Sequence, residues 1–239
     1  MLVNKRKKVA IYDLVCYNFT TKLNGDKLMK IVFFGDSITD MGRSRIESDI
    51  DRPYGLGTGY VFFASGDLLR ENPLDYKIIN SGISGNRVVD LYTRVKADVW
   101  NYNPDVLSIL IGVNDIWHEI GSKNGVEIER FETVYRMLIK DTIKKLPNVK
   151  LILLEPYVLE GTATKDNMPE FEKVYDYANV VKNLAEEFGL AFVPLQNALT
   201  NAGKKYGNDA VLYDGVHPST YGSRIIADEW LKVFNAKIK

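Results

Sequence analysis

Three side chains in two short segments of this chain have the chemical types that acyl transfer needs. Ser37 supplies a hydroxyl, and Asp214 and His217 supply a carboxylate and an imidazole three positions apart. A serine hydroxyl becomes a good nucleophile only when a nearby base removes its proton, and histidine is such a base near neutral pH. A carboxylate beside the imidazole fixes its tautomer and stabilises the imidazolium. We therefore predict that Ser37, His217 and Asp214 form a catalytic triad.

Each of these residues also has a purely structural interpretation. Ser37 and Asp40 together form a Ser-x-x-Asp pattern, which is typical of the start of a helix. Asp214 could serve only to cap a turn before Pro218. No single residue decides between the catalytic and the structural interpretation. The strands and helices that position these residues must therefore be considered.

Five apolar runs predict the strands of a parallel sheet. They cover residues 30–34, 77–79, 106–111, 151–154 and 191–193. Near-continuous apolar strands that alternate with helices are typical of a sheet covered on both faces. We expect one α/β domain, a three-layer α/β/α sandwich with five parallel strands in a flavodoxin-like order.

Helical periodicity occupies the segments between these runs. Apolar residues recur every three to four positions over residues 128–146, and Pro147 is expected to end that helix. A second apolar stripe covers residues 171–188 and is followed by Gly189, a residue typical of a helix end. The last helix is expected to begin near Ser219.

The predicted topology brings the candidate residues to one edge of the sheet, beyond the carboxyl ends of the strands, where such sheets bind ligands. Ser37 follows the first strand, Gly85 the second and Asn114 the third. The backbone amides of Ser37 and Gly85 and the side-chain amide of Asn114 are suitable donors to the oxyanion of a tetrahedral intermediate. Gly85 could instead be an ordinary turn glycine, and Asn114 could be a helix N-cap.

The second histidine and a glycine-rich segment do not indicate further sites. His118 is interpreted as a surface or pocket-rim residue, because two histidines without a His-x-x-x-His spacing argue against a zinc site. The glycines at 55, 57 and 59 lack the preceding strand and the spacing of a dinucleotide-binding loop. We expect no metal site.

The composition argues against several classes of protein. The 239 residues include 31 basic and 31 acidic side chains, so no basic excess indicates a nucleic-acid partner. No apolar run reaches the roughly 18 residues of a membrane-spanning helix, and the single cysteine, Cys16, cannot form an intrachain disulfide. The basic residues 5–8 precede a short apolar stretch that Asp13 interrupts, so we expect a cytoplasmic protein.

Four ordered motifs resemble those of the SGNH (GDSL-type) esterases. They are Gly35-Asp36-Ser37, Gly85, Gly112-x-Asn114-Asp115 and Asp214-x-x-His217. The resemblance implies a flavodoxin-like α/β/α fold, Ser37 as nucleophile and His217 as base with Asp214. It also implies an oxyanion hole formed by the amides of Ser37 and Gly85 and by Asn114, and no cofactor.

Longer stretches are similar to those of intracellular SGNH acetylxylan esterases, for example Gly82-Ile83-Ser84-Gly85-Asn86 and Val216-His217-Pro218-Ser219. That subgroup removes acetyl groups from xylo-oligosaccharides and forms homo-oligomers. The resemblance thus implies a small-molecule or oligosaccharide ester as substrate, and the lack of a long apolar run argues against a membrane partner. Gly215 departs from the subgroup, and Tyr213 stands where a tryptophan is found, so the acceptor is less firmly implied than acetyl-ester chemistry.

Four residues near the site are predicted to contact the substrate: Asp36, Arg43, Trp117 and Tyr213. Trp117, Tyr157 and Tyr213 could stack against sugar rings, although aromatic residues at such positions also serve packing. Arg43 could contact substrate, or it could pair with Asp40 or Glu47.

The domain boundary is expected near Met29, which directly precedes the first strong strand. We predict that residues 1–28 form an extension outside the core and that residues 29–239 form the SGNH hydrolase domain. Two other functions compete with a carbohydrate acetylesterase: a short-chain thioesterase or lysophospholipase, and a catalytically silent carbohydrate-binding relative. The presence of every reacting group argues against the silent relative.

Overall fold

The predicted strands form one parallel sheet in the computed structural model, which describes residues 28–50 and 52–239. They are β1 (Met29–Gly35), β2 (Tyr76–Gly82), β3 (Val106–Leu110), β4 (Lys150–Leu154) and β5 (Ala191–Val193). Their order across the sheet, β2-β1-β3-β4-β5, is the flavodoxin-like order. The predicted fold class is therefore confirmed.

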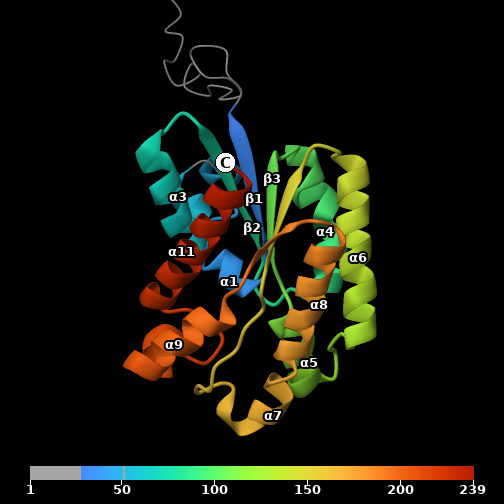
Figure 1. The fold of residues 1–239 in the computed structure, drawn as a ribbon, viewed down its shortest axis with the longest axis vertical. Helices are drawn as coiled ribbons and strands as arrows, with labels where there is room; N and C mark the ends of the chain where they lie inside the picture. The colour runs from blue at the N-terminus through green and yellow to red at the C-terminus, as the bar shows by residue number, and fades with distance from the viewer. Residues whose placement is uncertain (1–27, 51) are drawn as a thin grey trace, which may run out of the picture.

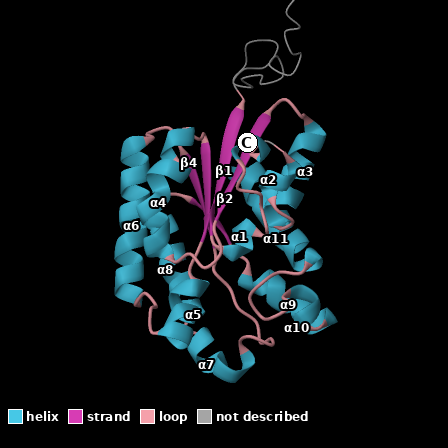
Figure 2. Ribbon diagram, turned by 180° about the vertical axis from the view of Figure 1, so that it is seen from behind, coloured by secondary structure: helices cyan, strands magenta, loops and turns pink. Residues whose placement is uncertain are grey.

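Helices cover both faces of this sheet, as Figure 1 shows. On one face α3 (Tyr60–Glu71) packs against α11 (Thr220–Lys237), and on the other lie α4 (Val88–Asp98), α6 (Ile128–Lys145) and α8 (Val174–Glu187). Figure 2 shows the same three layers from behind.

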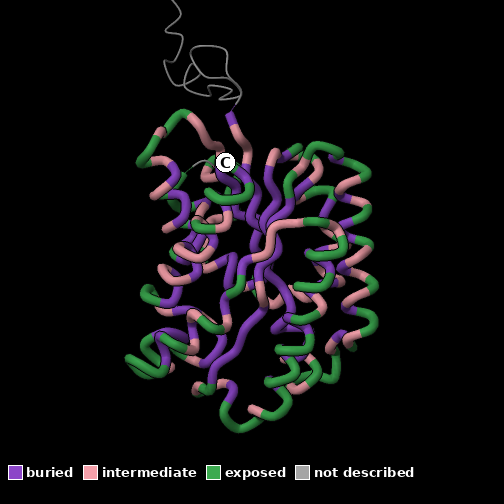
Figure 3. Tube along the Cα trace, in the orientation of Figure 1, coloured by how far each residue is buried: buried purple, intermediate pink, exposed green. Residues whose placement is uncertain are grey.

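The central strands are buried on both faces, which explains why they read as continuous apolar runs in the sequence. Figure 3 shows this buried core between the exposed outer faces of the helices. Trp230 of α11 lies against Phe33 of β1, with 4.9 Å between the ring centroids. Its indole N–H donates to the Ser108 hydroxyl at 3.0 Å, so the one polar group of this large side chain is satisfied.

Two helix ends lie where the sequence predicts them. α6 ends at Lys145, two residues before Pro147. α11 begins after Ser219, whose hydroxyl accepts a hydrogen bond from the Gly222 amide at 3.1 Å and so caps the helix.

The single helix predicted over residues 171–188 is wrong: this segment contains the end of α7 (Met168–Phe171) and then α8. At the junction the Lys173 amide donates to the Glu170 carbonyl, and the Tyr175 amide donates to the Glu172 carbonyl. These bonds span three residues, whereas those of an α-helix span four. Because the backbone stays near helical angles there, the apolar stripe continues across the break and hides it.

Shorter elements complete the described chain: α1 (Ser37–Asp40), α2 (Pro53–Leu56), α5 (Val113–Ser122), α9 (Gln196–Tyr206), α10 (Asn208–Val211), and the 3₁₀ turns Glu47–Asp49, Trp100–Tyr102 and Lys165–Asn167. The carboxyl ends of the strands point toward α1 and α5 (Figure 1). The predicted extension, residues 1–28, lies outside the described residues except for Leu28. Among the residues that the structure describes, every helix is too short or too polar to cross a bilayer.

Candidate active site

The serine, the histidine and the aspartate lie in one chain of hydrogen bonds, although Ser37 and His217 are 180 positions apart. His217 Nε2 is 2.9 Å from Ser37 Oγ, and His217 Nδ1 is 2.7 Å from Asp214 Oδ2. The base is thus within reach of the serine proton, and the carboxylate holds the opposite ring nitrogen. The structure brings together the three residues that the sequence selects.

Asp214 both caps a turn and bonds to the histidine, which are the two roles that its position in the sequence suggests. Its Oδ1 accepts hydrogen bonds from the Val216 amide at 2.9 Å and the His217 amide at 2.7 Å, so the carboxylate caps the turn. Its Oδ2 remains for the imidazole of His217. The turn therefore fixes the carboxylate and the histidine relative to each other.

The hydrogen bond that His217 donates to Asp214 raises the pKa of His217, and partial burial acts in the opposite direction. For Asp214 itself burial acts to raise the pKa, but the bonds from the His217 side chain and from the His217 and Val216 amides outweigh it. The pKa of Asp214 is lowered as a result. The carboxylate thus stays ionised while the imidazole accepts a proton.

Ser37 lies on a sharp turn between β1 and α1. The N-cap of α1 is Asp36, whose Oδ1 accepts a hydrogen bond from the Ile38 amide at 2.9 Å. A helix does begin at Ser37, as the Ser-x-x-Asp pattern indicates, but Asp36 and not Ser37 caps it, so the Ser37 hydroxyl is left to His217. Gly35 permits the turn, since a Cβ there would lie 2.4 Å from the Thr39 hydroxyl.

The glycine predicted for the oxyanion hole lies in a turn with an open side. The Asn86 amide donates to the Ile83 carbonyl at 3.2 Å, and Gly85, third in that turn, has φ of +80°. Those are features of a type II turn, which favours glycine at this position. A Cβ on Gly85 would have room, because its nearest neighbour would be His118 Nε2 at 4.0 Å. The positive φ, and not a lack of space, is therefore what favours glycine here.

Two backbone amides near the serine are available to an oxyanion. Neither the Ser37 amide nor the Gly85 amide has an acceptor among the described residues. Asn114, the second residue of α5, donates from Nδ2 to the Asn86 carbonyl at 3.1 Å. The N-cap of α5 is Gly112, so the interpretation of Asn114 as the N-cap is wrong.

A cleft of about 460 Å³ opens over these groups. Its lining consists of Ser37, Ser84, Gly85, Asn114, Trp117, His118, Gly121, Ser122 and His217. Aromatic rings flank the histidine: Trp117 lies 5.8 Å from the His217 ring, and Tyr213 stacks on it at 5.7 Å and 14°. Tyr213 is 54% exposed and is not among the residues that line the cleft.

Other residues that the sequence singles out lie elsewhere. Arg43 does not line the cleft, because its Nε donates to the Gly82 carbonyl at 2.7 Å. Tyr157 is fully buried, so the idea that it stacks against a sugar is wrong. His118 lies at the cleft, as expected for a pocket-rim residue.

Asp36 lies beneath the serine and is fully buried, so it is not on the surface of the cleft. Burial raises the pKa of its carboxyl to about 7, although the Ile38 amide and the nearby His217 act to lower it. Its Oδ2 has no hydrogen-bond partner among the described residues. The charge of Asp36 in turn contributes to the raised pKa of His217.

Sequence reasoning missed the part played by Asp40. This buried carboxylate accepts hydrogen bonds from the Ser84 amide and the Ser84 hydroxyl and pairs with the Arg45 guanidinium. It therefore joins α1, which begins with Ser37, to the turn that holds Gly85. No pattern of spacing points to this contact, because 44 positions separate the two residues.

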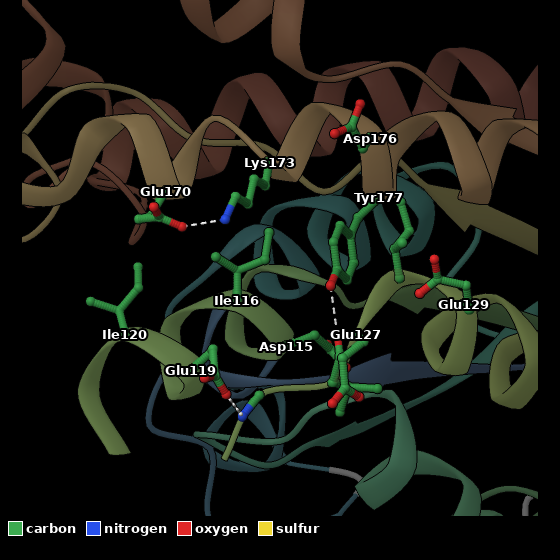
Figure 4. A pocket seen from close by; sticks show the side chains of 13 residues that line it. Asp115, Ile116, Glu119, Ile120, Glu127, Glu129, Glu170, Lys173, Asp176 and Tyr177 are labelled. Atoms are coloured by element: carbon green, nitrogen blue, oxygen red, sulfur yellow. Dashed lines mark hydrogen bonds and ion pairs between the residues drawn. The ribbon is translucent and has the colours of Figure 1, made fainter. Parts of the chain in front are cut away.

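A second cavity, of about 430 Å³, lies on the side of α5 that carries Ile116 and Ile120 (Figure 4). Its polar groups mostly hold neighbouring segments together. The Tyr177 hydroxyl donates to the Val126 carbonyl at 2.6 Å, and a Glu119 carboxylate oxygen accepts from the Gly125 amide at 3.1 Å. Within residues 28–50 and 52–239, no group of three or more His, Cys, Asp or Glu side chains could hold a metal ion.

The chain matches the GDSL-like lipase/acylhydrolase family over residues 33–225. It belongs to that family. A curated acetylxylan esterase from Geobacillus stearothermophilus is 38% identical over 210 residues, which cover 85% of this chain and 92% of the relative. This GDSL-like family member is a carboxylic ester hydrolase.

Solved structures agree with the assignment to the family. A GDSL-like lipase from Parabacteroides merdae superposes with a TM-score of 0.82 at 39% identity, over 87% of this chain and 96% of that one. The structure of the Geobacillus stearothermophilus acetylxylan esterase gives a TM-score of 0.76 at 37% identity, over 85% of this chain and 93% of that one.

Proposed function

We propose that this GDSL-like hydrolase is a serine esterase that removes acetyl groups from carbohydrate, and that acetylated xylo-oligosaccharides are its substrates. The hydrogen-bonded chain from Ser37 through His217 to Asp214, at the floor of an open cleft, is the observation that carries the proposal. The similarity to an acetylxylan esterase supports it. Structures of that relative include catalytic mutants in which a serine, an aspartate and a histidine three positions after the aspartate are changed to alanine.

In the acylation step, Ser37 Oγ attacks the ester carbonyl carbon while His217 Nε2 takes the hydroxyl proton. The negative oxygen of the tetrahedral intermediate accepts hydrogen bonds from the Ser37 and Gly85 amides and from the Asn114 side chain. Collapse breaks the bond to the sugar oxygen, which receives the proton from His217. The acetyl group stays on Ser37 and the sugar leaves as an alcohol.

Deacylation repeats these steps with water. His217 removes a proton from a water molecule, whose oxygen attacks the acetyl carbonyl carbon, and the same donors hold the second oxyanion. The bond to Ser37 Oγ breaks and the serine regains its proton from His217. Acetate leaves, and no cofactor or redox change is needed.

The position of two aromatic rings supports a carbohydrate as the leaving alcohol. His217 must lie beside the leaving oxygen in order to protonate it, and Trp117 and Tyr213 flank that imidazole. An exposed tyrosine ring presents an apolar face with a polar end, which suits a sugar ring. We therefore assign substrate contacts to Trp117 and Tyr213.

The proposal is tested by hydrolysis of nitrophenyl esters of increasing acyl length and of acetylated xylo-oligosaccharides. We expect the wild type to prefer acetate, and Ser37→Ala to lose about 10⁴-fold or more in kcat. Equal activity in Ser37→Ala would exclude this nucleophile. A preference for eight-carbon acyl chains would favour a lysophospholipase instead, and inactivity on every ester with retained oligosaccharide binding would favour a silent carbohydrate-binding relative.

We also propose that the enzyme acts in the cytoplasm as a homo-oligomer. The single cysteine suits a reducing compartment, and the subgroup that the sequence resembles forms homo-oligomers. Light scattering coupled to size-exclusion chromatography measures the mass directly. A monomeric mass at micromolar concentration would contradict the oligomer.

A further inference from the structure

Arg94 of α4 makes an unusual set of contacts outside the cleft. Its Nη2 donates to the Gly35 carbonyl at 2.9 Å, its Nη1 to the Ser81 carbonyl at 2.8 Å, and its Nε to Asn86 Oδ1 at 2.6 Å. The guanidinium also pairs with Asp98 at 2.6 Å and lies over the Phe34 ring, 4.4 Å from its centroid. Only 14% of the side chain is exposed.

The three acceptors belong to segments that carry the oxyanion donors. Gly35 precedes the turn on which the Ser37 amide lies. Ser81 lies near the end of β2, and Asn86 closes the turn that contains Gly85. The carbonyl of Asn86 also accepts the hydrogen bond from Asn114 Nδ2 at 3.1 Å, which extends the connection to the third donor.

We propose that Arg94 is a positioning residue that sets the geometry of the oxyanion hole; this inference rests on the proposed function. Oxyanion donors work only when they lie about 2.7–3.1 Å from the developing charge, and an error of about 1 Å costs about 100-fold in rate. The donors come from three separate segments of the chain, and one rigid guanidinium contacts two of these segments directly and the third through Asn86.

The planar shape of arginine is essential to this role. The guanidinium presents five N–H donors in a fixed fork, whereas a lysine ammonium is a single point on a flexible stem. Arg94→Lys keeps a positive charge near Asp98 but cannot reach acceptors on both the Gly35 and the Asn86 segments at once. A residue that only stabilised the fold through its charge would tolerate this change.

Arg136 offers a matched control. It forms two side-chain ion pairs, with Glu132 and Glu187, whereas Arg94 forms one, with Asp98. Arg136 lies on α6 and contacts no segment of the site. Arg136→Ala therefore removes at least as many ion pairs as Arg94→Ala, but from the surface of a helix. Its kcat should stay within about twofold of the wild type.

The test measures kcat and KM for nitrophenyl acetate, per active site titrated with an organophosphonate, for the wild type, Arg94→Ala, Arg94→Lys and Arg136→Ala. We expect kcat to fall about 10- to 100-fold in both Arg94 variants, with KM within about threefold, because an interaction realised in the transition state is lost. Added guanidinium ion should raise kcat of Arg94→Ala and leave that of Arg136→Ala unchanged.

A titrated kcat of Arg94→Lys within twofold of the wild type would overturn the proposal. If Arg94→Ala does not fold, Arg94→Lys alone decides, because it keeps the aliphatic stem and the charge. Failure of the proposed function gives a different result: the organophosphonate would then label wild type and Ser37→Ala alike, or neither.

Discussion

Asp40 Oδ2 accepts hydrogen bonds from the Ser84 amide at 3.0 Å and the Ser84 hydroxyl at 3.1 Å. Asp40 ends the helix that begins with Ser37, and Ser84 directly precedes Gly85. One buried carboxylate therefore joins the segment that carries Ser37, the proposed nucleophile, to the segment that carries Gly85, a proposed oxyanion donor. The reactive geometry depends on contacts made behind the cleft as well as on residues that line it.

Asp40→Ala should lower kcat on nitrophenyl acetate about tenfold, because the turn that holds Gly85 loses its anchor on α1. It should also reduce the free energy of unfolding by about 1–3 kcal/mol, since two hydrogen bonds from Ser84 to a charged carboxylate are lost. Urea titration and steady-state kinetics measure the two effects. Asp228→Ala, which removes an ion pair with Arg224 on α11, is the control, and an equal loss of kcat there would contradict the assignment.

Asp214→Asn should lower the pKa seen in the acidic limb of the kcat/KM profile. Activity requires neutral His217, and its pKa is raised above the ordinary 6.5 chiefly by the bond to Asp214. Without that carboxylate the limb moves to lower pH, and kcat falls about 10⁴-fold because the tautomer is no longer fixed. An unchanged limb in the variant would show that another group controls the profile.

Asp36→Asn should change the dependence of stability on pH. The folded-state pKa of Asp36 is raised from 3.8 to about 7, so between these values the folded chain binds a proton that the unfolded chain has released. Wild-type stability therefore falls from about pH 4 to about pH 7 on account of this group, and the asparagine variant should lack that fall.

Between pH 4 and pH 7 the free energy of unfolding should fall by about 4 kcal/mol more in the wild type than in Asp36→Asn. Urea unfolding at both pH values measures this. The asparagine carbonyl can still accept the bond from the Ile38 amide, so the cap on α1 is kept. The acidic limb of activity should also move slightly to lower pH, since the charge of Asp36 helps to raise the pKa of His217. Identical pH dependence of stability in the two proteins would contradict the burial argument.

Tyr213→Ala should raise KM for acetylated xylo-oligosaccharides about tenfold and leave kcat/KM for nitrophenyl acetate within about threefold. The ring stacks on His217 and the side chain is 54% exposed, so we expect it to contact the sugar part of the substrate and not the acetyl group. Tyr206, which is equally exposed at 54% but packs edge-to-face against Tyr221, provides the matched control. Equal effects of Tyr206→Ala and Tyr213→Ala would remove Tyr213 from the substrate site.

Local chemistry and the period of the apolar residues were enough to predict the five-stranded sheet and the pairing of Asp214 with His217. Buried strands with continuous apolar runs gave the five-stranded sheet, because a strand covered on both faces has no polar side. Asp214 and His217 could be paired from their spacing, since one short turn holds both. The sequence did not show the break between α7 and α8, where the apolar stripe continues.

The contacts that hold the segments of the site in place could be found only in the three-dimensional structure. The acceptors of Arg94 include the carbonyls of Gly35 and Ser81, and every residue has a carbonyl, so the sequence carries no signal of such contacts. The contact between Asp40 and Ser84 likewise exists because β1 and β2 are neighbours in the sheet. The residue types indicated the candidate reacting groups, and the order of the strands brings these groups within hydrogen-bonding distance of one another.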